Sequence, residues 1–102
     1  MSIEKRYLKT KEICKVTFKL SPEESGDAQS AFLVGEFNDW DLTSLPMRKR
    51  KDGTFRIVVD LPVGHTYQFR YFLDNERWAN DWSADAYRYS EFGNCENSVV
   101  EV

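Results

Sequence analysis

The amino-acid sequence predicts an all-β fold, an antiparallel β-sandwich made of two stacked sheets. Short segments alternate between apolar and polar residues, and turn signals separate them at a spacing of about ten residues. No segment keeps the 3.6-residue apolar periodicity of an amphipathic helix. The 102 residues, 41% hydrophobic and 15% aromatic, suffice for one core. We therefore expect a single domain over residues 1–102, with residues 1–10 as an N-terminal arm.

The first elements are predicted from alternation and capping. The segment from Ile13 to Leu20 alternates strictly and is typical of a half-buried strand. The Ser-Pro-Glu-Glu run that follows at residues 21–24 has the pattern of a helix cap, but Gly26 comes at once, so we expect a loop with one helical turn. Residues 31–35 are apolar throughout and predict a central strand.

The second half of the chain predicts hairpins. Residues 47–51 and 54–61 flank Asp52-Gly53, a strong hairpin-turn signal. A turn at 62–65 leads to a strand over 67–73, and a second turn at 74–75 leads to a short arm that carries Trp78. Residues 79–97 are polar and are expected to be irregular, and 98–102 form a closing strand. The expected core consists of the inward-facing residues Phe18, Phe32, Val34, Ile57, Val59, Phe69 and Tyr71.

Charge and targeting signals exclude several classes of function. Lys and Arg number 14 against 17 Asp and Glu, so the net charge is −3 and nucleic acid is not expected as a partner. The basic run at 48–51 leads directly into a hairpin turn and is interpreted as a solvated loop. The N-terminus lacks the hydrophobic stretch of a signal peptide, and no apolar run reaches the ~18 residues of a membrane span. We expect a cytoplasmic protein that does not contact a membrane.

Few residues are available for metal or cofactor chemistry. Cys14 and Cys95 lie near opposite ends of the chain. Paired terminal strands would allow a disulfide between them, but in a reducing compartment we expect two free thiols. His65 falls in a Pro-Val-Gly-His turn, and one His with two separated Cys gives too few ligands for a metal site. The sequence predicts no metal and no cofactor.

Several spaced motifs together indicate a known family. They are the segments Leu33–Trp40 (LVGEFNDW), Asp52–Phe55 (DGTF), Leu61–Tyr71 (LPVGHTYQFRY), Asp74–Trp78 (DNERW) and Phe92–Val102 (FGNCENSVVEV). In this order they resemble the isoamylase N-terminal, or early-set, family of immunoglobulin-like sandwiches. That family includes the carbohydrate-binding modules of family 48 and the glycogen-binding domain of the AMP-activated kinase β subunit. The resemblance covers the chain from about Lys11 onward.

The resemblance implies a set of sugar-binding residues. In glycogen-binding relatives two Trp form a shallow aromatic platform for α-1,4-linked glucose, and they match Trp40 and Trp78. The basic residue that binds sugar hydroxyls matches Arg70, where the kinase relatives carry Lys. In the last loop the apolar wedge matches Phe92, and Asn94, Glu96 and Asn97 lie where polar ligands would be. Two departures are Trp82, where the family usually has Pro, and the Asn94-Cys95-Glu96 sequence of that loop. The implied binding residues are Trp40, Arg70, Trp78, Phe92, Asn94 and Asn97.

These residue types also suit sugar recognition on physical grounds. A pyranose ring has an apolar C–H face and a rim of hydroxyls, so its binding site needs flat aromatic rings and a few hydrogen-bonding groups. For Trp40 and Trp78 the alternative is that each plugs an end of the sandwich, and for Arg70 it is an ordinary surface position. Trp82 is expected to pack under the 79–97 loop.

The sequence thus predicts non-catalytic binding of α-glucan, either glycogen or a starch-like oligosaccharide. Glycoside hydrolysis needs two carboxylates that face each other across a cleft, whereas most acids of this chain fall in turns or alternate outward on strands. We expect no enzyme activity and no catalytic residues. The alternative is a protein-interaction module that docks a partner, such as a glycan-active enzyme of a glycan-metabolism or regulatory complex, without binding sugar.

Overall fold

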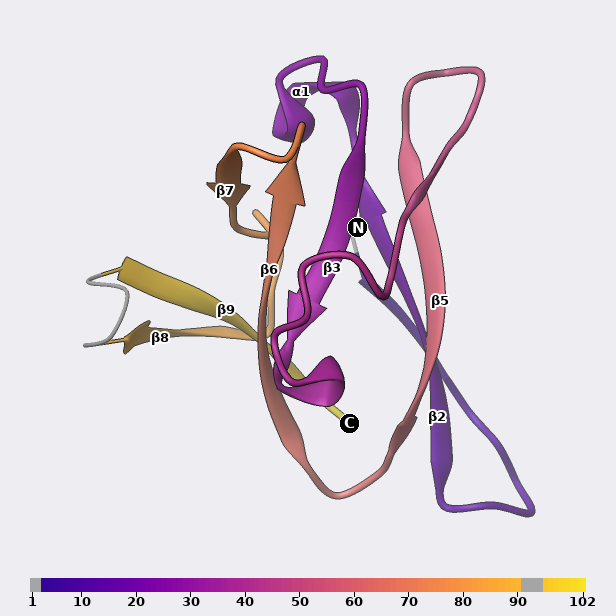
Figure 1. Cartoon of the computed structure of the whole chain (residues 1–102). Helices are drawn as coiled ribbons and strands as arrows, with labels where there is room; N and C mark the ends of the chain where they lie inside the picture. The colour runs from indigo at the N-terminus through magenta and orange to yellow at the C-terminus, as the bar shows by residue number, and fades with distance from the viewer. Residues whose placement is uncertain (1–2, 91–94) are drawn as a thin grey trace.

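The computed structural model, which describes residues 3–90 and 95–102, is built from two antiparallel sheets (Figure 1). The first sheet has the strand order β1-β2-β5-β4 and the second β3-β6-β9-β8, with β7 also paired to β6. The predicted all-β, immunoglobulin-like sandwich is confirmed. The strands are β1 (Ile3–Tyr7), β2 (Ile13–Leu20), β3 (Ala31–Gly35), β4 (Arg48–Lys49), β5 (Phe55–Pro62), β6 (Thr66–Leu73), β7 (Arg77–Ala79), β8 (Ala86–Ser90) and β9 (Cys95–Glu101).

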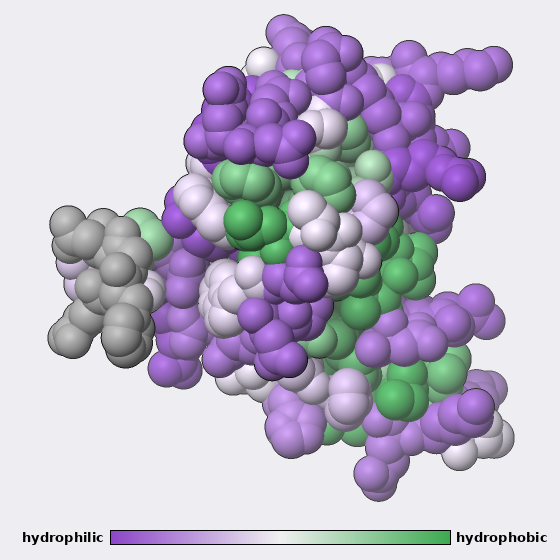
Figure 2. Space-filling model, viewed as in Figure 1, coloured by the Kyte–Doolittle hydropathy of each residue, from purple (hydrophilic) through white to green (hydrophobic). Residues whose placement is uncertain are grey.

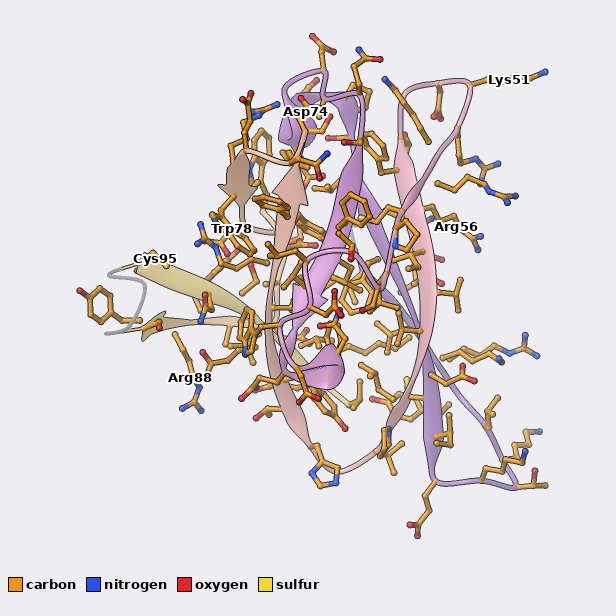
Figure 3. The ribbon with its side chains drawn as sticks, in the orientation of Figure 1. Lys51, Arg56, Asp74, Trp78, Arg88 and Cys95 are labelled. Atoms are coloured by element: carbon orange, nitrogen blue, oxygen red, sulfur yellow. The ribbon has the colours of Figure 1, made fainter. Side chains whose placement is uncertain are left out.

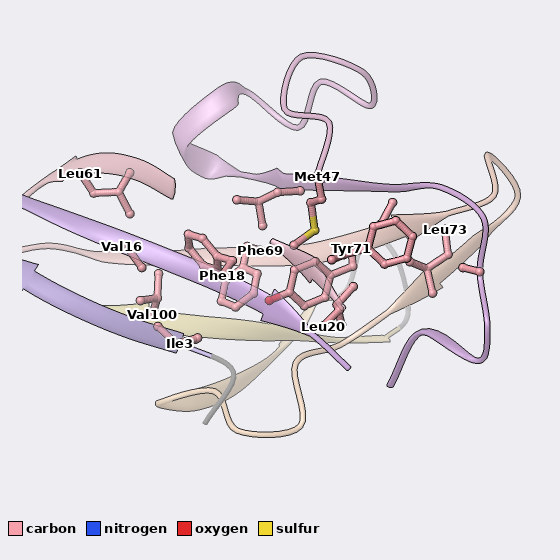
Figure 4. Close-up of a cluster of buried hydrophobic side chains, with 14 of the residues drawn as sticks. Ile3, Val16, Phe18, Leu20, Met47, Leu61, Phe69, Tyr71, Leu73 and Val100 are labelled. Atoms are coloured by element: carbon pink, nitrogen blue, oxygen red, sulfur yellow. The ribbon is translucent and has the colours of Figure 1, made fainter. Parts of the chain in front are cut away.

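The core lies between the two sheets and is formed by alternate residues of their strands (Figure 4). In β2 every second side chain is fully buried, as the alternation predicts. Phe18 of β2 meets Phe69 of β6 edge-to-face, with ring centroids 5.0 Å apart. Ile57 and Val59 of β5 are half-buried and pack against this cluster.

Two residues of the expected core lie on the wrong side of the second sheet. Phe32 pairs with Phe72, which pairs with Trp78, and Val34 pairs with Arg70. Directly paired residues point to the same face of a sheet, so Phe32 and Val34 share the outer face with Arg70 and Trp78. Phe32 is half-buried there, although Val34 is fully buried. The predicted burial is confirmed for Val34 but not for Phe32. The inward direction expected for both was wrong because β3 is apolar at every position, and periodicity cannot choose a face in such a strand.

Local signals place the turns correctly. The short helix α1 (Pro22–Ser25) has a capping box in which Ser21 Oγ accepts from the Glu24 backbone N–H and the Glu24 carboxylate accepts from the Ser21 backbone N–H. Gly26 then ends the helix in the left-handed conformation, with φ of 61°. The hairpin at Asp52-Gly53 joins β4 to β5 as predicted.

Two edge strands, β1 of the first sheet and β8 of the second, differ from the sequence expectation. Residues 3–7, predicted to be part of an N-terminal arm, form β1 and pair with β2 from Ile3 to Tyr7. Residues 86–90, predicted to be irregular, form β8 and pair with β9, which begins at Cys95 rather than Ser98. An edge strand pairs with only one neighbour and buries few side chains, so its sequence can be polar and need not show the apolar alternation that predicts a strand.

A buried polar contact fixes the loop between β7 and β8. The Tyr71 hydroxyl donates to Asp81 Oδ2 over 2.7 Å, and both side chains are fully buried. The Asp81 N–H donates to Ser98 Oγ over 2.9 Å. Burial and the adjacent Asp81 carboxylate raise the pKa of Tyr71 well above its usual value. No helix within the described residues has the length and apolar character needed to cross a membrane.

Candidate functional site

The outer face of the second sheet collects most of the predicted binding residues that the structure describes. Arg70 lies on β6 and Trp78 on β7, and the pairing of β6 with β7 and β9 points their side chains to the side away from the core. Figure 3 shows Trp78 beside β6, at the base of the hairpin formed by β8 and β9. In the same view, Figure 2 shows exposed hydrophobic residues near the middle of the molecule, with hydrophilic residues around them.

Trp78 is held between two neighbours on this face. Its ring centroid lies 4.8 Å from that of Phe72, its direct partner on β6, and the Arg70 guanidinium carbon lies 5.2 Å from the Trp78 ring centroid. A guanidinium over an indole face is a favourable cation–π arrangement. The side chain nevertheless remains 41% exposed. Trp78 therefore presents a supported indole to solvent rather than plugging the core.

Arg70 is fixed by contacts on both sides. Its Nη1 donates to Cys95 Sγ over 3.2 Å, and its Nε is buried without a hydrogen-bond partner. The described contacts thus leave some of its five N–H donors for a further ligand. Cys95 was not among the predicted site residues. A strand prediction that began β9 at Cys95 would have placed the thiol on the same face as Asn97, two positions on.

Asn97 belongs to the same face but is more buried than expected of a sugar ligand. It is 7% exposed, and its Nδ2 donates to Gln68 Oε1 over 3.0 Å. The Gln68 backbone N–H in turn donates to the carboxylate of Glu36, in the 3₁₀ turn η1 (Glu36–Asn38). These hydrogen bonds tie β9 and β6 to the turn that precedes Trp40. Gln68 and Glu36 were missed because nothing in their local sequence marks them.

Trp40 lies in a turn that Asn38 organises. Asn38 Oδ1 accepts from the Gly35 N–H over 2.9 Å, and its Nδ2 donates to Ser44 Oγ over 2.9 Å and to the carbonyls of Leu33 and Asp41. Trp40 itself has a φ of 58° and is 39% exposed. Among the described residues, no ring contact or hydrogen bond joins its side chain to Arg70 or Trp78.

Gly35 explains why the Gly-x-Phe-Asn motif begins with glycine. A Cβ at this position would lie 2.7 Å from the Gln68 carbonyl oxygen, 2.8 Å from Phe69 Cβ and 2.9 Å from Phe37 Cζ. Those distances are too short for any side chain, so β3 approaches β6 closely only with glycine here. The motif is therefore a packing requirement that also positions the Trp40 turn.

The remaining predictions have different outcomes. Phe92 and Asn94 lie outside the described residues. Trp82, expected to pack under a loop, is instead 64% exposed. Cys14 is buried, which raises the pKa of its thiol, and both Cys14 and Cys95 are free. No group of three or more His, Cys, Asp or Glu able to hold a metal ion occurs in residues 3–90 and 95–102.

Comparison with known proteins places this arrangement in a family. The family described as Carbohydrate-binding module 48 (Isoamylase N-terminal domain) matches residues 14–88. The 1,4-alpha-glucan branching enzyme GlgB of Lactobacillus acidophilus is 48% identical over 44 residues, which are 42% of this chain and 7% of the enzyme. The chain thus matches only a small part of that enzyme's length. Since the family match extends from β2 to β8, the chain belongs to the carbohydrate-binding module 48, or isoamylase N-terminal domain, family.

Proposed function

We propose that this domain binds α-glucan without catalysis, through the outer face of the second sheet. The observation that carries the proposal is the contact between Arg70 and Trp78, in which a guanidinium at 5.2 Å supports an indole that is still 41% exposed. The binding residues are Trp40, Arg70 and Trp78, with Phe92, Asn94 and Asn97 contributed by the last loop and strand. Glycogen or a starch-like oligosaccharide is the ligand, in keeping with the branching enzyme that this chain resembles.

The chemistry of the face suits a sugar chain. The exposed indole of Trp78 can stack on the C–H face of a glucose ring, and the N–H groups of Arg70 can donate to its hydroxyls. A Trp that covers about 60 Å² of sugar contributes roughly 1.5 kcal/mol at about 25 cal/mol/Å². Two such rings and a few hydrogen bonds give a dissociation constant between about 1 µM and 1 mM, after the cost of immobilising the ligand.

An NMR titration with maltoheptaose tests the proposal. The indole N–H signals of Trp40 and Trp78 and the side-chain signal of Arg70 should shift, while core residues Phe18 and Val59 should not. Trp78→Ala should raise the dissociation constant obtained from the Trp40 and Arg70 shifts roughly tenfold, because loss of about 1.5 kcal/mol weakens binding by that factor.

Two controls sharpen the experiment. Tyr7→Ala removes another exposed aromatic side chain, on β1, and should leave the maltoheptaose titration unchanged. Cellopentaose offers the same sugar in β-1,4 linkage and should bind more weakly, since its extended chain presents a different curvature. Absence of any shift of Trp40, Trp78 and Arg70 at millimolar maltoheptaose would refute the proposal and favour a protein-docking role for this face.

A further inference from the structure

A second exposed aromatic surface lies away from the Trp78 face. Trp82, in the loop between β7 and β8, is 64% exposed, and Tyr87 and Tyr89 of β8 are 44% and 62% exposed. Such a concentration of aromatic area within one short segment is unusual on a protein surface and marks a site of contact with another molecule. We name these three residues the β8 aromatic surface.

The strand register places the two Tyr on the inner side of the second sheet. Tyr87 pairs with Ser98 and Tyr89 with Glu96, and Ser98 also pairs with Phe69 of the core. The Arg88 side chain, between the two Tyr, therefore points to the opposite side, toward that of Asn97. Tyr87 and Tyr89 consequently lie on the opposite side of the second sheet from Trp78.

The first sheet does not extend far enough to cover this part of the second. The first sheet ends at β1 and the second at β8, and Figure 1 shows the β8–β9 hairpin projecting away from β2 and β5. Lys5 of β1 reaches only to Asp85, at the start of β8, through an ion pair of 2.6 Å. Beyond that contact, Tyr87 and Tyr89 on the inner side of the hairpin are exposed.

Hydrogen bonds hold the aromatic residues in place without burying them. The Tyr87 hydroxyl donates to the Asp81 carbonyl over 2.5 Å, beside the peptide bond that joins Asp81 to Trp82. The Trp82 N–H donates to Glu24 Oε2 over 3.3 Å. Asp81 is itself anchored in the core by Tyr71. The Tyr87 side chain and the Trp82 backbone are thus positioned before any ligand arrives, which reduces the entropic cost of binding.

The neighbouring charges indicate the class of ligand. Glu96 is exposed on the same side as Tyr89, and Glu24 lies at Trp82. Flat rings bordered by carboxylate acceptors suit a neutral ligand with many hydroxyl donors, whereas a phosphate or another acidic group would be repelled. Arg88, the basic residue of β8, points to the other side. A carbohydrate fits this combination of groups.

We propose that Trp82, Tyr87 and Tyr89 form a second carbohydrate-binding surface that stacks on a segment of neutral glycan. The ligand class, α-glucan, rests on the proposed function, but the location does not depend on the Trp78 face. With surfaces on both sides of the β8–β9 hairpin, one domain holds two segments of a branched polysaccharide. Binding to glycogen is then bivalent and tighter than binding to a short oligosaccharide.

Separate variants of the two surfaces test the inference with maltoheptaose. In Trp78→Ala the indole N–H signal of Trp82 should still shift with ligand. In the double variant Trp82→Ala, Tyr89→Ala the Trp78 signal should still shift, with a dissociation constant within about twofold of the original. Trp82→Phe, which retains both an aromatic ring and Tyr89, should keep part of the Tyr89 response. Tyr87 is left intact because its hydroxyl holds the loop, and thermal melts should show all variants folded.

Electrophoresis through gels that contain glycogen measures the combined effect of the two surfaces. Loss of either surface should weaken the apparent affinity for glycogen about tenfold or more, because bivalent attachment is lost. The inference is overturned if Trp82 does not shift with millimolar maltoheptaose in Trp78→Ala while Trp78 responds in the original protein. Trp82 shifts that follow protein concentration without sugar would overturn it in favour of self-association. If Trp82 responds and Trp78 does not, the inference stands and the proposed site on the Trp78 face fails.

Discussion

The Tyr71 hydroxyl donates a hydrogen bond of 2.7 Å to the carboxylate of Asp81, and neither side chain reaches solvent. This bond joins the core of the sandwich to the loop between β7 and β8, which carries Trp82. Asp81 also accepts from the Ser83 N–H over 2.7 Å, and its carbonyl accepts from Tyr87. Asp81 therefore links Tyr71 of β6 to Tyr87 of the β8 aromatic surface.

Removal of this hydroxyl should destabilise the fold. Tyr71→Phe deletes the donor, so the buried Asp81 carboxylate loses one of its hydrogen bonds. The free energy of unfolding should therefore fall by about 1.5–3 kcal/mol. Urea denaturation measures the loss. The matched variant Tyr87→Phe breaks a hydrogen bond to a neutral carbonyl nearer the surface and should cost only about 0.5–1.5 kcal/mol. A larger loss for Tyr87→Phe than for Tyr71→Phe would contradict this account of Asp81.

Alkaline pH should weaken the fold through Tyr71. Burial and then the Asp81 carboxylate raise its pKa well above 10.0 in the folded protein. As pH rises, Tyr71 therefore loses its proton in the unfolded chain before it does so in the folded protein. The contribution of Tyr71 to stability is complete below a pH of about 10 and declines as pH rises further. Denaturation series between pH 9 and 11 should show a shallower decline for Tyr71→Phe than for the original chain. Equal slopes would mean that Tyr71 does not control the alkaline response.

Core and surface aromatic residues should respond differently to truncation. Phe69 is fully buried between Phe18 and Tyr71, so Phe69→Ala leaves a cavity and should cost about 3–5 kcal/mol. Trp78 is 41% exposed, and Trp78→Ala should cost less than about 1.5 kcal/mol. Denaturant melts compare the two. Comparable large losses would identify Trp78 as a structural residue and argue against its role in sugar binding.

Gly35 should be sensitive to the smallest side chain. Gly35→Ala places a Cβ 2.7 Å from the Gln68 carbonyl oxygen and should cost about 1–3 kcal/mol through overpacking. It should also weaken maltoheptaose binding, because the displaced strand end carries the Trp40 turn. Gly64→Ala is the control: its Cβ meets nothing within 4 Å, although a φ of 80° strains it by about 1 kcal/mol. Weaker binding in Gly64→Ala as well would show that the binding effect is not specific to Gly35.

The two thiols should differ in reactivity and contribute no cross-link. Cys14 is fully buried and Cys95 is half-buried beside Arg70, so a thiol reagent should modify one residue in the native protein and two after denaturation. Dithiothreitol should leave the melting temperature unchanged. A disulfide that closes a loop of ~80 residues would contribute about 4 kcal/mol, so a large drop on reduction would reveal one.

Alternation and turn residues made much of the sandwich predictable. In β2 and β6 the period-two pattern identifies the buried side correctly, and Asp52-Gly53 locates the hairpin to the residue. The capping pattern at Ser21 likewise predicts the single helical turn. These features depend on local geometry, which neighbouring residues in the chain specify.

Long-range pairing decided what the local pattern could not. The strand β3 is apolar throughout, so only its pairing with β6 showed that Phe32 and Val34 face outward. The edge strands β1 and β8 bury one side at most, and their polar residues carried no signal. Tyr87 and Tyr89 are exposed on the inner side of the second sheet because the first sheet ends at β1, a property of the sheet order that no local stretch of sequence contains.

The same division holds for the candidate site. The sequence predicts Trp40, Arg70 and Trp78 as binding residues from their types and their spacing along the chain. Only the tertiary structure brought Arg70 against the Trp78 indole and the Cys95 thiol, because β6 pairs with β7 along one half of its length and with β9 along the other. Arg70 and Cys95 are 25 residues apart in the sequence, and Gln68 and Asn97 are 29 apart. Their contact is set by sheet register and burial, which arise only when the whole core is packed.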